Sequence, residues 1–327
     1  MSKQTMREHM KERFGKKDNV LSYNPPLPNS LNIELNNVCN QKCEFCGFHG
    51  KYKTWDFKPS MLKLDFVKEI LKEAKRVGIG EKEVGFYLSG EVFLYPDFAE
   101  IVAYTKELGF KYTFITSNGA LATPERIKAV LDAGLDSIRF SVNAADRETY
   151  KTIHGSDDFD AVVKNITFMH DYIQENNMNV ATSISCVVTK KQGSDLQEKV
   201  RDLFSDKVDD ILFIPVMLDH LSDMDNAIEE FGVYDKGEKV LNKEFKCPIL
   251  FNTMYINSDG HVIPCCNAPY TDYYVYDLNQ KLDLEAAWYS EGYKRLRQIF
   301  IDDADDKGTI CEDCILRFKG AERLSMD

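Results

Sequence analysis

Three cysteines on one short loop constrain this chain more than any other feature of its sequence. Cys39, Cys43 and Cys46 follow a β-like run at residues 31–35 with the spacing Cys-x3-Cys-x2-Cys. A four-iron, four-sulfide cube takes one thiolate per iron, so three cysteines leave one iron without a protein ligand. Such a vacancy creates a reaction centre, as it does in catalytic zinc sites with three protein ligands. A zinc knuckle or a disulfide pair is the alternative interpretation.

Size and composition exclude several classes of protein. The 327 residues are 43% hydrophobic and 29% charged, which is ordinary for a globular protein of about two units. The net charge of −12 argues against a nucleic-acid partner. No apolar run approaches the ~20 residues of a membrane span and the N-terminus lacks an apolar signal, so we expect a cytoplasmic protein with no membrane partner. Nine cysteines in such a protein indicate metal ligation rather than disulfides.

Hydrophobic periodicity predicts a repeated β-α pattern over the first two thirds of the chain. Strands are expected at 31–35, 84–91, 112–116, 135–143, 180–188 and 210–216, and helices within 61–78 and at 97–109, 124–133, 160–176 and 194–204. Six such units predict an α/β fold, a partial (β/α)6 TIM-type barrel whose chemistry lies at the C-terminal ends of its strands. The predicted domains are an N-terminal lead-in (1–24), the barrel (25–217), a linker (218–246) and a C-terminal domain (247–327).

The cysteine loop resembles the motif of the radical S-adenosylmethionine (SAM) superfamily, Cys-x3-Cys-x-aromatic-Cys, with Phe45 in the aromatic position. In that family the open iron of a [4Fe–4S] cluster chelates SAM. An electron from the cluster then breaks a carbon–sulfur bond and yields a 5′-deoxyadenosyl radical. The resemblance implies SAM and this cluster as cofactors, and a low-potential electron donor such as flavodoxin or ferredoxin as partner.

The same resemblance implies contacts with SAM at the ends of successive strands. Ser89-Gly90-Glu91 resembles the family's Gly-Gly-Glu, which binds the SAM ammonium group. His154 stands where many members place an arginine that meets the SAM carboxylate, and Lys151 could substitute for it. The remaining expected contacts are Phe45, Ser117, Asn118, Ser141 and Ser183. Strand alternation puts Ser183 on the polar face of its strand and Cys186 on the opposite face, which favours a buried Cys186.

A second group of cysteines lies in the C-terminal domain. A hairpin at 254–263 carries Cys247 before it and Cys265 and Cys266 after it, and a helix at 284–300 precedes Cys311-x2-Cys314. This arrangement resembles Twitch, the one-cluster version of the SPASM extension of radical SAM proteins. The resemblance implies an auxiliary [4Fe–4S] cluster with the ligands Cys247, Cys265, Cys311 and Cys314. Zinc is the alternative for four thiolates, and Cys266 could exchange with Cys265.

The resemblance implies an enzyme that abstracts hydrogen from a small polar, carbohydrate-like substrate and then oxidises or epimerises it. The preference for a small molecule rests on an N-terminal segment that looks too short for a leader-peptide-binding domain. Modification of a ribosomal peptide or protein side chain is one alternative, and a non-catalytic metal-binding regulator is another. Cys266 and Cys186 are candidate hydrogen-atom donors for epimerisation. Unranked candidates for a general base are Glu34, His49, Tyr87 and His220.

Overall fold

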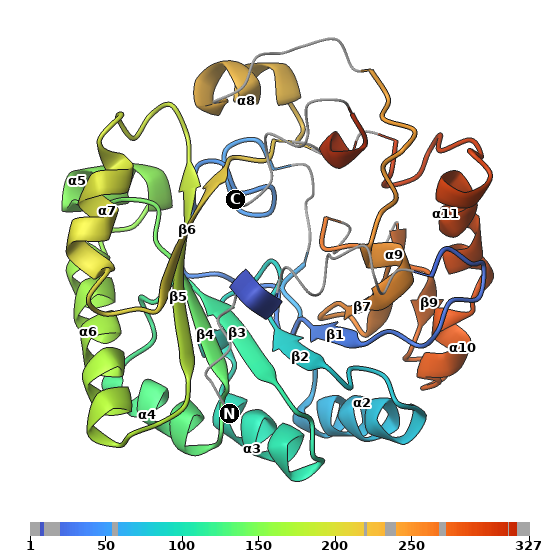
Figure 1. Cartoon of the computed structure of the whole chain (residues 1–327), viewed down its shortest axis with the longest axis horizontal. Coiled ribbons are helices and arrows are strands. Elements are labelled where there is room, and N and C mark those ends of the chain that lie inside the picture. The colour runs from blue at the N-terminus through green and yellow to red at the C-terminus, as the bar shows by residue number, and fades with distance from the viewer. Residues whose placement is uncertain are drawn as a thin grey trace.

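One mixed sheet organises the described part of the chain (Figure 1). The computed structural model describes residues 7–9, 20–53, 58–218, 221–232, 240–267, 273–312 and 314–318. Within them the strand order is β6-β5-β4-β3-β2-β1-β7-β8-β9. The strands are β1 (Ser30–Ile33), β2 (Glu83–Phe86), β3 (Thr113–Ser117), β4 (Ser137–Ser141), β5 (Ala181–Val188), β6 (Asp210–Pro215), β7 (Thr253–Ile256), β8 (His261–Ile263) and β9 (Tyr276–Asp277).

The first six strands are parallel neighbours, and helices cover their outer face (Figure 1). The principal covering helices are α2 (Leu64–Val77), α3 (Phe98–Glu107), α4 (Pro124–Asp132), α6 (Phe159–Glu175) and α7 (Leu196–Phe204). Each buries an apolar stripe at helical spacing, such as Val67, Ile70, Leu71 and Ala74 of α2. This arrangement confirms the predicted partial (β/α)6 barrel. Pro215, which lacks an N–H group, ends β6, the strand at the edge of the sheet.

The predicted C-terminal hairpin extends the barrel sheet directly. Strand β7 pairs in parallel with β1, with Asn32 opposite Tyr255, and β8 then pairs antiparallel with β7. The backbone N–H of Glu34 also donates to Ile256 O at 2.8 Å. Strand β1 therefore lies between the barrel strand β2 and the strand β7 of the cysteine-rich C-terminal region.

Several helices differ from the sequence expectation. The helix expected at 284–300 is two helices, α10 (Leu284–Trp288) and α11 (Glu291–Ile301), because Ser290 starts a new helix and accepts a hydrogen bond from Tyr293 N. Helix α8 (Met224–Phe231) lies inside the predicted linker, and α5 (Arg147–His154) was not expected as a separate helix. The short elements are α9 (Ile249–Asn252), which was also not expected, and the 3₁₀ turns η1 (Val92–Leu94) and η3 (Ile315–Arg317).

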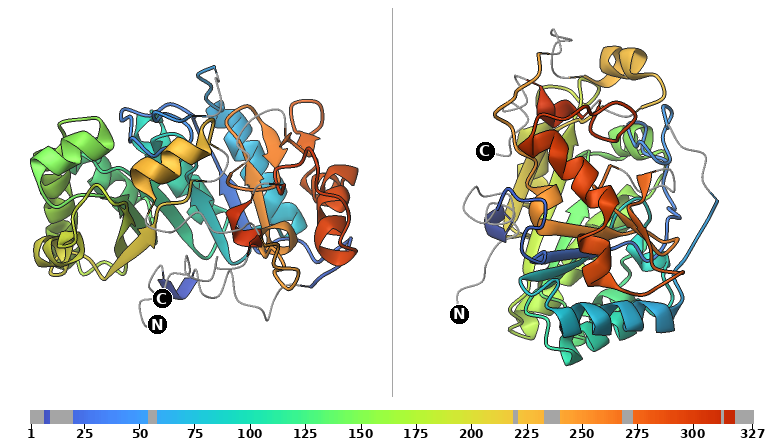
Figure 2. Two further views of the ribbon diagram at one scale, coloured as in Figure 1. Left: turned by 90° about the horizontal axis from the view of Figure 1, so that it is seen from above. Right: turned by 90° about the vertical axis from the view of Figure 1, so that its right-hand side faces the viewer.

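Helix α8 covers the first cysteine loop. Its residues Ala227 and Phe231 form a buried apolar cluster with Val216 and Leu218, and Phe45 and Tyr52 of the loop region pack against that cluster. Figure 2 shows α8 beside the loop in both views. Among the described residues, no helix combines the length and apolar character needed to cross a membrane.

Candidate functional site

The loop after β1 presents its three thiols to a shared space. The thiol of Cys39 is close enough to that of Cys46 for their charges to interact. The thiol of Cys43 is close enough to interact with both. Burial raises the pKa of all three thiols, that of Cys39 to about 11. Binding of iron must therefore displace protons, as it does when metals bind thiolates.

Backbone N–H groups surround the sulfur atoms of this loop. Gln41 N lies 3.5 Å from Cys39 Sγ, and the amides of three residues after Cys46 face its sulfur. Gly50 packs so closely that a Cβ atom there would lie 2.5 Å from Cys46 O and 2.6 Å from Cys43 O. Donors aimed at sulfur stabilise cluster thiolates. The donor set and the tight backbone cradle fit a [4Fe–4S] cluster bound at Cys39, Cys43 and Cys46.

Glu91 joins the ends of β2 and β3. Its side chain is 2% exposed, and its carboxylate accepts from Ser117 Oγ at 2.8 Å, Asn118 N at 2.8 Å and Phe93 N at 3.1 Å. Burial raises the pKa of this carboxyl. The structure therefore gives Glu91 and Ser117 a structural role, and their contact with SAM stays a prediction. Asn118 does reach the cysteine loop, because its Nδ2 lies 2.8 Å from Asn40 Oδ1 and 3.7 Å from Cys39 Sγ.

Ser89 and Gly90 are held by residues just after β1. Ser89 donates both its N–H, at 3.0 Å, and its hydroxyl to the buried carboxylate of Glu34. A Cβ at Gly90 would lie 2.2 Å from Asn36 O. The glycine is thus required by the close approach of Asn36, a backbone contact that the sequence motif did not reveal. Contact of Ser89 and Gly90 with SAM stays a prediction.

His154 does not fit its predicted role. The imidazole is completely buried, and burial lowers its pKa to about 3. Its Nε2 lies 3.1 Å from Asn143 N, and its Nδ1 faces Gln41 and Cys43. A neutral ring with both nitrogens engaged cannot act as the cation that meets the SAM carboxylate. Lys151, the substitute, points to Asp157 at 3.8 Å.

Three further residues of the barrel region were predicted to contact SAM, and each has different surroundings. Ser183 faces the barrel interior, fully buried, and its hydroxyl has no hydrogen-bond partner among the described residues. Ser141 ends β4 opposite Ser185 and is partly exposed. Phe45 packs under α8. For these three positions, a contact with SAM stays a prediction.

Cys186 belongs to the hydrophobic core. It is fully buried on the outer face of β5, and burial raises the pKa of its thiol to about 12. The expected burial is confirmed. A thiol in the core cannot reach a substrate. The prediction that Cys186 could donate a hydrogen atom to the substrate is therefore wrong.

The second group of cysteines converges from three segments. The thiol of Cys247 is close enough for a charge interaction with three others, those of Cys265, Cys266 and Cys311. Cys265 also contacts Cys266 directly. Cys314 N lies 3.4 Å from Cys311 O. Within the described ranges, no three Cys, His, Asp or Glu side chains are close enough to hold a single metal ion. The thiols fit a second iron–sulfur cluster, and in the adjacent pair the sulfur of Cys265 accepts from a backbone N–H, that of Asn267.

The candidate bases differ in their surroundings. Glu34 is buried and accepts from Ser89 and Ser258, and His49 Nε2 lies 3.1 Å from Ser89 O. Tyr87 OH lies 3.2 Å from Tyr255 OH. His220 lies outside the described residues. The structure brings Glu34, His49 and Ser89 into one network next to the cysteine loop.

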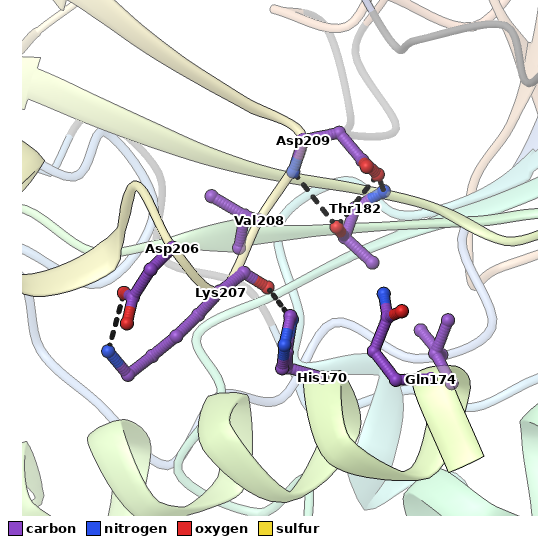
Figure 3. Close-up of a pocket in the computed structure, with 8 residues that line it drawn as sticks. His170, Gln174, Thr182, Asp206, Lys207, Val208 and Asp209 are labelled. Carbon is purple, nitrogen blue, oxygen red and sulfur yellow. Dashed lines mark hydrogen bonds and ion pairs between the residues drawn. The ribbon is translucent and has the colours of Figure 1, made fainter.

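A separate polar pocket lies at the opposite end of the barrel strands (Figure 3). It encloses about 160 Å³ between α6 and the starts of β5 and β6, and Thr182, His170 and Asp209 line it. Asp209 accepts from Thr182 N at 2.7 Å. Chemistry in parallel barrels gathers at the C-terminal strand ends, so this pocket is not part of the candidate site.

Comparison with known protein families decides the class. The family described as the Radical SAM superfamily matches residues 33–203, more than half of the chain. The chain belongs to the radical SAM superfamily. A second match, to an iron–sulfur cluster-binding domain called SPASM, covers residues 247–315. Together the two matches assign SAM, a SAM-binding [4Fe–4S] cluster and an auxiliary cluster to this radical SAM protein as cofactors.

The proteins to which this chain is similar differ in their names and in the molecules bound to them. A probable GTP 3′,8-cyclase of Saccharolobus islandicus is 36% identical over 157 residues, which are 48% of this chain and 45% of that protein. The chain thus spans less than half the length of this curated relative. Streptococcus suis SuiB, solved with its precursor peptide SuiA, has a TM-score of 0.64 at 18% identity and covers 84% of this chain and 68% of that one. BtrN, solved with AdoMet and 2-DOIA, has a TM-score of 0.52 at 15% identity and covers 84% and 88%.

Proposed function

We propose that this radical SAM enzyme oxidises a small polar substrate at a C–H bond, with an auxiliary cluster of the Twitch type accepting the electron. The polar inner face of the barrel carries the proposal. Arg139 of β4 lies opposite Thr116 of β3, and its guanidinium donates to Thr116 Oγ1 at 3.0 and 3.2 Å. Both side chains are partly exposed. A lining of hydroxyl and guanidinium groups selects a substrate that can form hydrogen bonds.

When bound, the reduced SAM cluster and SAM supply a 5′-deoxyadenosyl radical that removes one hydrogen atom from the substrate. Oxidation then requires the substrate to lose one electron and one proton. The auxiliary cluster, held by its cysteines, would supply the electron acceptor, and a basic side chain near the cysteine loop, such as Glu34 or His49, would take the proton. The overall change is the loss of two hydrogen atoms, and a C–H carbinol becomes a carbonyl.

Two tyrosines lie between the barrel interior and the auxiliary cysteines. Tyr87 follows β2, Tyr255 lies in β7, and their hydroxyl oxygens are 3.2 Å apart. Tyr255 belongs to an apolar cluster with Ile263, and Cys247 and Cys265 pack against that cluster. Tyr87 packs there too. This continuous protein contact supports electron transfer from a substrate in the barrel to the auxiliary cluster.

Cys247, Cys265, Cys311 and Cys314 are the proposed ligands of the auxiliary cluster. Four thiolates cover four irons, which leaves that cluster no open position for substrate and suits it to electron transfer. Epimerisation is the competing outcome. It would need a thiol that returns a hydrogen atom, and Cys266 is the remaining candidate because Cys186 is in the core.

A peptide substrate is the second candidate, since SuiB shares the fold and was solved with a precursor peptide. At 18% identity this likeness supports the architecture alone. The match with GTP 3′,8-cyclases spans 45% of their length and likewise does not fix the substrate.

The test separates these outcomes with one assay. Reduced, reconstituted enzyme and SAM are incubated without oxygen with either a small-metabolite fraction or a peptide fraction, in deuterated water. The proposal expects 5′-deoxyadenosine formation to rise with the small-metabolite fraction and the product to lack two hydrogen atoms. Stimulation by peptides alone contradicts the substrate class. A product of unchanged composition that carries deuterium at carbon contradicts oxidation and supports epimerisation.

A further inference from the structure

The neighbours of His154 fix the position of its proton. The ring lies at the end of α5, stacked on Tyr150 with a centroid distance of 3.9 Å and an interplanar angle of 9°. Its Nε2 lies 3.1 Å from the backbone N of Asn143. A backbone N–H can only donate, so Nε2 must accept. The imidazole is therefore neutral and carries its hydrogen on Nδ1.

Two acceptors face this Nδ1–H group. Gln41 Oε1 lies 2.9 Å from Nδ1, and Cys43 Sγ lies 3.5 Å from it. The Gln41 amide is itself oriented, because its Nε2 donates to Tyr150 OH at 2.8 Å. The sulfur of Cys43 thus shares a hydrogen-bond donor with a fixed carbonyl oxygen.

The last turn of α5 also holds the backbone around Cys43. Lys42 N donates to His154 O at 3.1 Å, and Glu44 N donates to Ile153 O at 2.9 Å. Gly155, with φ +62°, packs so closely on Lys42 that a Cβ would lie 2.8 Å from Lys42 O. Both neighbours of Cys43 are anchored to the same helix end, so Cys43 and His154 are held in one fixed relationship.

We propose that His154 is a positioning residue that donates a hydrogen bond to the Cys43 thiolate and raises the reduction potential of the SAM-binding cluster. Reduction adds negative charge to a cluster, and a donor at a ligand sulfur stabilises that charge. This inference rests on the proposed cluster at Cys39, Cys43 and Cys46. It replaces the SAM-carboxylate contact that the sequence position suggests.

Two substitutions test the roles of the two ring nitrogens of His154 separately. In His154→Asn the side-chain amide nitrogen stands near the place of Nδ1 and keeps a donor toward Cys43. In His154→Gln the amide reaches the place of Nε2, where its oxygen accepts from Asn143 N–H but no donor faces the sulfur. We expect the potential of the SAM-binding cluster to fall in the Gln variant and to stay close to wild type in the Asn variant.

The measurement is a redox titration of the full, reconstituted protein, followed by electron paramagnetic resonance of the reduced SAM-binding cluster. His170→Gln is the control, because His170 lies in α6 beside Lys207 O, in the pocket at the other end of the barrel. An unchanged potential in His154→Gln overturns the inference, and so does an equal shift in the Asn and Gln variants.

A second measurement uses the wild-type protein and does not depend on the variants taking up iron. With ¹⁵N-labelled histidine, hyperfine spectroscopy of the reduced cluster is expected to detect a histidine nitrogen and an exchangeable proton coupled to the cluster. The absence of both couplings overturns the inference. Absence of any cluster at the first cysteine loop would instead overturn the proposed function, so the two failures are distinguishable.

Discussion

The buried carboxylate of Glu34 accepts a hydrogen bond from the backbone N–H of Ser258 at 3.0 Å. Glu34 follows β1, and Ser258 lies in the turn between β7 and β8. The other carboxylate oxygen accepts from Ser89 after β2. One side chain therefore ties the barrel to the hairpin that precedes Cys265.

Replacing Glu34 with Gln is expected to loosen this connection. The amide presents an NH₂ group to one of the N–H donors, and that buried donor loses its acceptor. We expect the free energy of local opening of the β7–β8 hairpin to fall by about 2 kcal/mol. Hydrogen exchange of peptides covering residues 253–263 in the iron-loaded protein measures this value.

Glu107→Gln provides the matched control, because Glu107 ends α3 with an exposed side chain. Equal protection of the hairpin in wild type and Glu34→Gln would show that the carboxylate does not hold the hairpin to the barrel.

Gly50→Ala is expected to prevent assembly of the first cluster. The new Cβ would clash with the carbonyl oxygens of Cys46 and Cys43 and force the loop open. With two four-iron clusters per chain, the loss of one removes about half of the iron. Iron and sulfide analysis after reconstitution checks this expectation.

Gly47→Ala tests whether the effect is specific. Gly47 lies in the same loop as Gly50, but its Cβ would meet only Leu221 Cδ2, at the ordinary contact distance of 3.5 Å. Full iron content is expected for Gly47→Ala. Similar iron loss in both variants would mean that the loop tolerates no substitution. It would contradict the specific role given to the close packing of Gly50.

The choice between Cys265 and Cys266 gives a third prediction. Cys265 Sγ lies 3.4 Å from Asn267 N, so its sulfur has a backbone donor, and the spacing Gly260-x4-Cys265 also favours it. Cys265→Ala is expected to lose the auxiliary cluster and about half of the iron, and Cys266→Ala is expected to keep both. The reverse result would exchange their assigned roles.

Glu230 of α8 gives the fourth prediction. Its carboxylate accepts from Lys191 at 2.5 Å, Lys51 at 2.7 Å and Tyr52 OH at 2.6 Å, and Lys191 also reaches Glu44 of the cysteine loop at 2.9 Å. These contacts lower the pKa of Glu230 to about 2. Glu230→Gln removes the charge that links α8 to both lysines. We expect roughly two- to fivefold faster hydrogen exchange in α8, the range for partly exposed ion pairs.

Glu229→Gln, on the same helix, is the control for that comparison. If exchange in α8 is the same in both variants, the apolar cluster of Phe231, Ala227 and Phe45 suffices to hold the helix over the loop.

The sequence predicted those features of the fold that follow from the periodicity of single strands and helices. Alternation along β5 placed Ser183 and Cys186 on opposite faces, and the structure has that arrangement because successive strand side chains point to opposite sides. The C-terminal ends of β1, β2 and β3 likewise meet at one rim, where Asn118 lies beside Cys39.

Contacts between distant segments were not predictable from local patterns. The position of His154 suggested a cation, but the ring is neutral because it is buried and because its Nε2 accepts from the backbone N–H of Asn143 after β4. The pairing of β7 with β1 likewise joins segments more than 200 residues apart. Helix α8 did leave a signal, since Asp223 caps it and Ala227 and Phe231 stand four residues apart on one face.

The most direct test of the central claim is the formation of 5′-deoxyadenosine from SAM by the reduced, iron-loaded protein under oxygen-free conditions. Wild type is expected to form it, and the triple variant Cys39→Ala, Cys43→Ala, Cys46→Ala is expected to form none while its auxiliary cysteines still bind iron. An iron-loaded wild type that forms no 5′-deoxyadenosine, or a triple variant that forms as much as wild type, would contradict radical chemistry at the first cysteine loop.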